Sequence, residues 1–221
     1  MVDALACAFD HSGRGQLKLT GAVMTDEETL NVYAAKADEY AKRFTTAKPD
    51  LHLAAFMLAV AKNGRVLDLG CGTGRSTAFM IKAGLRAEGL DASAEMADLA
   101  RKTNGVDVAV GGFETLDADA AYDGIYANFS LLHAPKAEMP EHLDRVSKAI
   151  VPGGFLHIGL KTGTGEKRDA LGRFYAYYTD AEITGLLVDA GFVVIERSFG
   201  ADEGLDGTLA PWIILLAGTV K

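Results

Sequence analysis

Five residues in the first half of the chain have the types and the spacing of a site for a nucleotide cofactor. They are Asp68, Gly70, Gly72, Gly74 and Asp91. Glycines permit positive φ angles and let a ligand approach the bare backbone. The free N–H groups at the start of a following helix point to the same place. The pattern therefore predicts a cradle for a cofactor between a strand and a helix.

The elements that must position these residues are predicted by the periodicity around them. Val66–Leu69 is a short, mostly apolar stretch with the character of a buried strand, and Arg86–Asp91 is a second strand. From Arg75 onward, apolar residues recur at helical spacing. A dinucleotide fingerprint, G-x-G-x-x-G, would have a third glycine where Arg75 stands. The spacing thus disfavours a pyrophosphate at this turn.

This strand–turn–helix–strand unit resembles the class I S-adenosylmethionine-dependent methyltransferases. Their first motif is a hydrophobic strand followed by (D/E)-x-G-x-G-x-G, and their second is an acidic residue that ends strand two. Asp91 matches the second motif, 17 residues after Gly74. Within the family, the chain looks like small bacterial methyltransferases of type 11/12, of the ubiquinone and menaquinone biosynthesis kind. The resemblance implies S-adenosyl-L-methionine as cofactor and S-adenosyl-L-homocysteine as product.

The resemblance also implies a set of cofactor contacts. The acid at the end of strand two would accept hydrogen bonds from the ribose hydroxyls, and Met96 and Phe113 would cover the adenine. Tyr40 and Arg43 would lie near the methionine end. Core packing is the alternative for Met96 and the tyrosine, and a surface position is the alternative for the arginine. The expected contacts are Asp68, Gly70, Cys71, Gly72, Gly74, Asp91, Ala92, Met96, Phe113, Asn128, Tyr40 and Arg43.

Composition limits the class of protein. With 221 residues, 49% of them hydrophobic, the chain can bury one sizeable core. A net charge of −8 argues against a nucleic-acid surface, and no apolar run approaches the roughly 20 residues of a membrane span. Cys7 and Cys71 indicate neither a disulfide framework nor a structural metal. We expect a cytoplasmic enzyme without a secretory signal.

With the resemblance, the order of elements predicts one α/β domain over residues 1–221. Residues 1–25 are expected to be a flexible N-terminus, with Met24 as an alternative start, and residues 26–62 a helical cap over the cofactor. Residues 63–221 would form a Rossmann-like core. Its seven-stranded, mostly parallel sheet would have the order 3-2-1-4-5-7-6 with the last strand antiparallel. The sixth strand is expected at residues 192–196.

The connection after the fifth strand is the least ordinary segment. Residues 161–178 far exceed the roughly 2–6 residues usual for such a loop, and they combine glycines, cations and aromatic residues. This composition indicates a lid over a small substrate, with a negative charge on that substrate as one option. The alternative is a solvated loop whose tyrosines pack on the N-terminal helices. The candidate substrate residues are Tyr33, Lys161, Arg168, Arg173 and Tyr175.

His133, in the segment after strand four, is the candidate general base, because an unperturbed imidazole titrates near neutrality. The alternative is structural: a histidine just before Pro135 can hydrogen-bond a loop carbonyl and fix the start of the next helix. A base is needed only if the acceptor must lose a proton. The sulfonium methyl is already electrophilic, so the protein must mainly align the reactants and exclude water.

Several other activities fit less well. Asn128-Phe129-Ser130-Leu131 lacks the prolines of nucleic-acid amino-methylating enzymes, and no cysteine follows Cys71 to act as a cytosine-C5 nucleophile. No cluster of acids for a divalent metal can be assembled. An NAD(P)-dependent Rossmann oxidoreductase is a first alternative, although the chain has no Tyr-x-x-x-Lys pair. A cofactor-binding regulator without catalysis is a second. The acceptor atom and the oligomeric state stay open.

Overall fold

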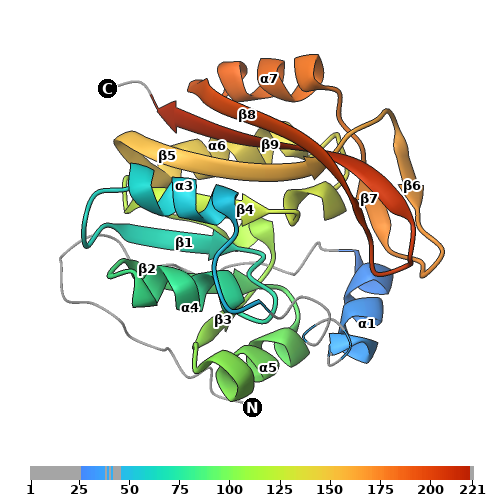
Figure 1. Ribbon diagram of the computed structural model, residues 1–221. Coiled ribbons are helices and arrows are strands. Elements are labelled where there is room, and N and C mark those ends of the chain that lie inside the picture. Colours follow the sequence, from blue (N-terminus) through green and yellow to red (C-terminus); the bar gives the residue numbers. More distant parts are fainter. Residues whose placement is uncertain (1–25, 38, 40, 42–45, 220–221) are drawn as a thin grey trace, which may run out of the picture.

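A seven-stranded sheet forms the centre of the computed structural model (Figure 1). The structure describes residues 26–37, 39, 41 and 46–219, so Tyr40, Arg43 and the expected flexible segment 1–25 lie outside the described residues. The strand order is β3-β2-β1-β4-β5-β9-β8, with β1 to β5 parallel and β9 antiparallel to both neighbours. Because β8 and β9 are the sixth and seventh strands of this sheet in chain order, the predicted order is confirmed.

The central strands are short and the C-terminal ones are long. The sheet consists of β1 (Arg65–Leu69), β2 (Arg86–Asp91), β3 (Val108–Val110), β4 (Tyr122–Asn128), β5 (Ile150–Lys161), β8 (Phe192–Glu203) and β9 (Leu209–Thr219). Every residue of β1 is buried, as expected for a parallel strand covered on both faces. The strand predicted at 192–196 is too short, because β8 continues in register with β9 as far as Glu203.

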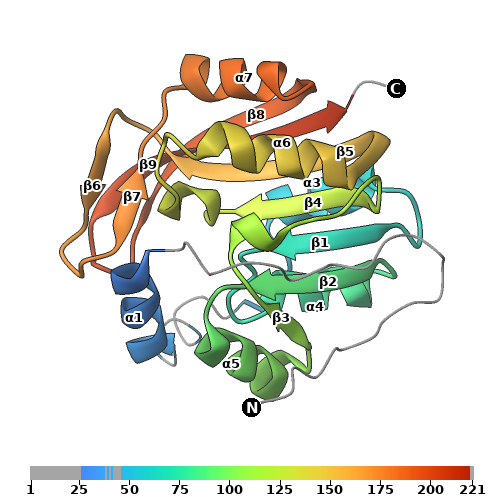
Figure 2. The same cartoon turned by 180° about the vertical axis from the view of Figure 1, so that it is seen from behind.

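Helices cover both faces of this sheet (Figures 1 and 2). The helices are α1 (Glu27–Ala35), α3 (Leu51–Ala59), α4 (Arg75–Lys82), α5 (Ala94–Asn104), α6 (Met139–Ala149) and α7 (Asp180–Asp189), with short 3-10 turns η1 (Phe113–Thr115) and η2 (Leu131–His133). On the face of α3 and α4, Phe56 and Met80 pack with the sheet, and on the opposite face Leu143 and Leu187 do so. These two apolar layers fix the carboxyl ends of β1, β2 and β4.

The segment 161–178 is an ordered hairpin. Its strands β6 (Glu166–Arg168) and β7 (Phe174–Ala176) pair antiparallel outside the main sheet. The hairpin, α1 and the turn between β8 and β9 lie together beyond the carboxyl ends of the parallel strands (Figures 1 and 2). In the part of the chain that the structure describes, no helix is both long and apolar enough to cross a membrane.

Candidate functional site

The turn between β1 and α4 has the backbone that its sequence requires. Gly70, Gly72 and Gly74 all have positive φ angles, of 74°, 53° and 68°. A Cβ on Gly70 would lie 2.3 Å from the Cβ of Ser130, so the turn also needs the absence of a side chain there. Ser130 donates a hydrogen bond to the carbonyl of Leu69, 2.6 Å away. The glycine turn is therefore fixed against the segment that follows β4.

Asp91 holds this turn from the end of β2. One carboxylate oxygen accepts the N–H of Gly72 at 2.7 Å, and the other accepts the N–H of Ser93 at 2.9 Å. Burial raises the pKa of Asp91 above its ordinary value. Each carboxylate oxygen has a second lone pair. The side chain can thus accept hydrogen bonds from a ligand while it anchors the backbone of the cradle.

Asp68 is a second buried carboxylate beside the glycine turn. It is 3% exposed, and the hydroxyl of Thr77 donates to it at 2.7 Å. Burial, followed by the negative charge of Asp91, raises the pKa of Asp68 to about 7, while the Thr77 hydrogen bond opposes the rise. A positively charged ligand group would stabilise the ionised form of Asp68, whereas a phosphate would destabilise it.

The cleft above these residues has two lobes. The small lobe, of about 90 Å³, lies over the ends of β2 and β3, and the large lobe, of about 340 Å³, extends towards β5, β7 and the β8–β9 turn. Six residues line both lobes and so mark their junction. They are Tyr33, Gly70, Gly72, Asn128, Phe129 and His133.

Most predicted cofactor residues line one lobe or both. The small lobe includes Asp91, Ala92, Met96 and Phe113, the large lobe includes Asp68 and Cys71, and the junction includes Gly70, Gly72 and Asn128. Gly74 is not on the wall of either lobe. It is the N-cap of α4, and a Cβ there would lie 3.1 Å from Ala100, so its role is packing and turn geometry. Burial raises the pKa of the Cys71 thiol well above its ordinary value, so the thiol stays protonated.

His133 has partners on both ring nitrogens. Nδ1 lies 2.7 Å from the carbonyl oxygen of Phe174, which can only accept, so Nδ1 carries the proton. Nε2 then accepts from the hydroxyl of Tyr33 at 2.9 Å. Burial lowers the pKa of His133 to about 4. The imidazole is neutral near pH 7, and its accepting nitrogen is occupied.

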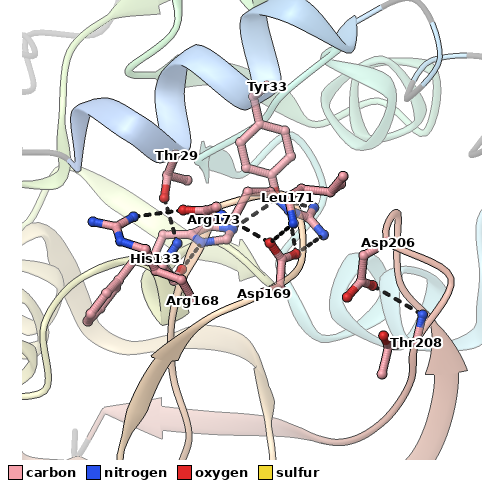
Figure 3. Close-up of polar contacts among 11 residues, drawn as sticks. Thr29, Tyr33, His133, Arg168, Asp169, Leu171, Arg173, Asp206 and Thr208 are labelled. Atoms are coloured by element: carbon pink, nitrogen blue, oxygen red, sulfur yellow. Dashed lines mark hydrogen bonds and ion pairs between the residues drawn. The ribbon is translucent and has the colours of Figure 1, made fainter.

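A polar network joins His133 to the hairpin and to α1 (Figure 3). Arg173 is 2% exposed, forms an ion pair of 2.6 Å with Asp169, and donates to the hydroxyl of Tyr33 at 3.2 Å. The N–H of Phe174 donates to Thr29 on α1 at 2.8 Å. The hairpin is therefore tied to α1 and to η2 by buried groups.

The predicted substrate residues separate into two sets. Tyr33, Lys161, Arg173 and Tyr175 line the large lobe. Arg168 does not, since its guanidinium donates to both carboxylate oxygens of Asp26, at 2.9 and 2.7 Å. That ion pair holds the pKa of Asp26 well below its ordinary value. Arg168 thus fastens the hairpin to the N-cap of α1.

Sequence reasoning missed three aromatic residues of the large lobe, Tyr126, Phe129 and Trp212. Phe129 has a φ of 55°, a left-handed conformation that bulky residues rarely adopt outside functional sites. Trp212 lies near the start of β9, and its indole N–H donates to Asp202 at 2.7 Å. A single tryptophan in the sequence gives no signal of this position. Among the described residues, no group of three or more metal-ligating His, Cys, Asp or Glu side chains occurs.

Residues 66–154 match a protein family described as a methyltransferase domain. The chain is 30% identical over 101 residues to an uncharacterized methyltransferase of Staphylococcus carnosus (strain TM300), which covers 46% of this chain and 49% of the relative. It is 30% identical over 157 residues to the O-methyltransferase cnsE of Penicillium expansum, 63% of this chain and 55% of that one. The chain therefore spans about half the length of these curated relatives.

A solved structure has the same fold along nearly the whole chain. It is the Burkholderia thailandensis 1,6-didemethyltoxoflavin-N1-methyltransferase, crystallised with 1,6-didemethyltoxoflavin and S-adenosylhomocysteine. The TM-score is 0.70, the sequence identity is 21%, and the alignment covers 97% of this chain and 99% of the other.

Proposed function

Residues 66–154 form a methyltransferase domain of the class I fold, and on this premise we propose that the chain transfers a methyl group from S-adenosyl-L-methionine to a small-molecule acceptor. One observation carries the proposal: two lobes of unequal size meet at the glycine turn and at Asn128. The cofactor's adenosine would occupy the small lobe and the acceptor the large lobe. The methyl group would then lie at the junction.

The small lobe offers contacts that suit an adenosine. Asp91 has lone pairs for the two ribose hydroxyls, and Met96 and Phe113 provide apolar surfaces for the adenine ring. We therefore propose as cofactor contacts the predicted residues that line the cleft. The predicted cofactor contacts of Tyr40 and Arg43 stay predictions, as does the resemblance to methyltransferases of ubiquinone and menaquinone biosynthesis.

The charge around the glycine turn favours a cation over a dinucleotide. Two buried carboxylates, Asp68 and Asp91, flank the backbone where a pyrophosphate would lie in an NAD(P)-dependent enzyme. A doubly negative pyrophosphate would be repelled there. The sulfonium and ammonium groups of S-adenosyl-L-methionine would be attracted instead. This electrostatic argument weighs against the oxidoreductase alternative.

S-adenosyl-L-methionine supplies an electrophilic methyl group when bound. The chain then has to align a nucleophile with that group and exclude water. Tyr33 and His133 close the junction from the side of α1 and η2, with the hairpin fixed behind them. We propose that His133 positions these elements, since a pKa of about 4 makes it a weak base near pH 7. Its role as general base would require Nε2 to exchange Tyr33 for the acceptor.

A thermal-shift comparison tests the proposal against both alternatives. A ligand at 100 times its Kd raises the free energy of unfolding by about 2.7 kcal/mol. We expect S-adenosyl-L-homocysteine to raise Tm and NADH to leave it unchanged. Stabilisation by NADH alone would favour an oxidoreductase. Binding of S-adenosyl-L-homocysteine without transfer of labelled methyl to any acid, phenol, amine or thiol would favour a regulator.

We further propose a cytoplasmic location and an acceptor that is not a nucleic acid. The support is compositional: the net charge is −8, and the chain has two cysteines far apart in the sequence. Cell fractionation and a filter-binding assay with labelled RNA and DNA test these two statements.

A further inference from the structure

The described cations on the wall of the large lobe differ in their partners. Arg173 is paired with Asp169, and Arg75 donates to the hydroxyl of Thr46 at 2.7 Å. Among the described residues, the ammonium of Lys161 makes no hydrogen bond and no ion pair within 4 Å, and its Nζ lies 3.8 Å from the centroid of the Tyr175 ring, while Asp206 and Asp169 act on it at longer range. Burial, followed by the charge of Arg173, lowers the pKa of Lys161. A half-buried ammonium that no carboxylate contacts directly can still pair with an anionic group of a ligand.

Lys161 lies close to the junction of the two lobes. Its neighbour Tyr175 also packs against His133, with ring centroids 4.7 Å apart, and His133 lines both lobes. The ammonium and a residue of the junction therefore contact the same aromatic ring. A ligand group held by Lys161 would lie near the position proposed for the methyl group.

Aromatic rings flank the same part of the large lobe. Lys161 and Trp212 are opposite each other in the antiparallel pairing of β5 and β9, so their side chains project from the same face. The Trp212 ring is fixed by Asp202 and lies edge-on to Phe129, with centroids 6.4 Å apart. Gly200 makes room for this ring, since a Cβ there would lie 2.2 Å from it. This part of the lobe thus combines flat aromatic surfaces with the ammonium of Lys161, while the carboxylates of Asp50, Asp68, Asp202 and Glu203 also line the lobe.

We infer that the large lobe binds a planar aromatic acceptor whose acidic O–H or N–H group is ionised, and that Lys161 pairs with that negative charge. The inference rests on the proposed function. Arg173 and Arg168 hold the hairpin and Arg75 donates to Thr46, whereas the ammonium of Lys161 contacts only an aromatic ring among the described residues.

The reaction of such an acceptor removes its charge. The anionic oxygen or nitrogen forms a bond to the methyl carbon, the carbon–sulfur bond breaks, and its electron pair stays on sulfur. The anion and the sulfonium become a neutral methylated product and a neutral thioether. Lys161 loses its counter-ion at this step, so the geometry favours binding of the acceptor over retention of the product.

The test compares Lys161→Met with Lys167→Met in the full chain. Met keeps most of the stem of lysine and removes its charge. Lys167 is a matched control, because it also lies over a tyrosine ring, 4.9 Å from the centroid of Tyr177, but is exposed and is not on the wall of either lobe. The probes are phenols, hydroxyquinolines and N–H-acidic pteridines, each paired with its neutral methylated form. Scanning calorimetry of each variant checks that it is folded, and titration calorimetry with S-adenosyl-L-homocysteine measures cofactor affinity.

We expect the native chain to methylate members of this acidic series, with a KM that falls as pH rises through the pKa of each acceptor. Lys161→Met should raise KM at least tenfold and flatten that pH dependence, while kcat changes less and the S-adenosyl-L-homocysteine affinity is kept. Lys161→Arg should keep KM and its pH dependence close to those of the native chain, and Lys167→Met should leave both unchanged.

Two results overturn the inference while the proposed function stands. One is cofactor binding with methyl transfer only to neutral, non-planar amines or thiols. The other is transfer to planar acids with a KM that Lys161→Met leaves within twofold. Failure of the native chain to bind S-adenosyl-L-homocysteine would instead contradict the proposed function itself, and the inference with it.

Discussion

The two lobes of the cleft are built from different kinds of structure. The small lobe is lined by the turns that follow β1, β2 and β3 together with residues of α1, α5 and the segment after β4, and backbone N–H groups hold its carboxylate Asp91. The large lobe takes side chains from α1, η2, β5, β7 and the β8–β9 hairpin. Under the proposed assignment, the glycines and the carboxylate of the cofactor site come from short motifs at strand ends, whereas the acceptor site depends more on segments that meet only in the folded chain.

The largest effect is expected from Arg173→Met, in the large lobe. Removing the guanidinium leaves the buried carboxylate of Asp169 without its partner, and breaking a buried ion pair costs about 3–5 kcal/mol. Urea unfolding should show that the free energy of unfolding falls by this amount. At a temperature where the variant is still folded, S-adenosyl-L-homocysteine should bind within about threefold of the native affinity, because Arg173 is not on the wall of the small lobe.

Arg197→Met is the control, since Arg197 is exposed and its ion pair with Asp180 is long, at 3.6 Å. It should change the free energy of unfolding by less than about 1 kcal/mol. An equal decrease in the free energy of unfolding of both variants would mean that Arg173 stabilises the fold no more than a surface arginine does.

Asp91→Asn perturbs the small lobe. Hydrogen bonds to a charged group contribute about 1.5–3 kcal/mol each, so weakening those to the ribose should reduce S-adenosyl-L-homocysteine affinity by roughly tenfold to several hundredfold. Asparagine is preferable to alanine, because Asp91 also holds the N–H groups of Gly72 and Ser93, and its amide oxygen can keep one of them. Calorimetry gives the affinity, and the exposed Asp98→Asn is the control. An unchanged affinity would show that the ribose is bound elsewhere.

The third prediction concerns pH and Asp68. Its pKa is about 7 in the free protein, and a bound cation favours the ionised form. Affinity for S-adenosyl-L-methionine should therefore fall about tenfold between pH 8 and pH 6. A pyrophosphate ligand would show the opposite sign. Calorimetry at several pH values measures the slope, which Asp68→Asn should remove.

The free energy of unfolding should depend on the protonation of Asp68 with the opposite sign, decreasing as pH rises. The folded pKa of Asp68 lies above its ordinary value of 3.8, so the folded state binds the proton more tightly. Its contribution to stability is fully present below pH 3.8 and is lost as pH rises towards 7. The difference between the native chain and Asp68→Asn in urea unfolding isolates this contribution from other titrating groups.

The contrast between the lobes also explains what the sequence could predict. The glycine turn and Asp91 follow from short spacings and the strand order follows from the family resemblance, and the structure has the turn, the acid and the order as expected. The partner of Arg168 is 142 residues away, so no local pattern could assign this cation to the hairpin rather than to a substrate. Arg173 pairs with Asp169 only four residues away, but its hydrogen bond to Tyr33 spans 140 residues and could not be predicted from local spacing.

The positions of Trp212 and Phe129 in the large lobe could not be predicted, for a similar reason. Trp212 reaches the large lobe only because β8 extends to Glu203 and pairs with β9, and the exposed, mixed composition of that extension has no buried alternation from which to predict it. Phe129 owes its place to a left-handed backbone that its side chain does not favour. Both positions depend on pairing and strain, which a single sequence does not reveal.

The smallest effect is expected from Arg168→Gln. The guanidinium of Arg168 pairs with Asp26 and Glu28 at a solvated position, and such pairs add little to global stability. Tm should shift by less than about 2 °C. Exchange of the hairpin amides should nevertheless accelerate several-fold, because this pair joins β6 to the N-cap of α1.

Hydrogen-exchange mass spectrometry of the peptide covering 163–178 measures that change, with Arg145→Gln as the control, since Arg145 forms an exposed pair within α6. S-adenosyl-L-homocysteine affinity should stay the same, while the acceptor KM should rise modestly as the hairpin loosens. If exchange and KM were both unchanged, the other contacts of the hairpin, such as those of Arg173, Phe174 and Glu166, would be sufficient to hold it. A weakened cofactor affinity would instead show that the two lobes are coupled through α1, against the separation argued above.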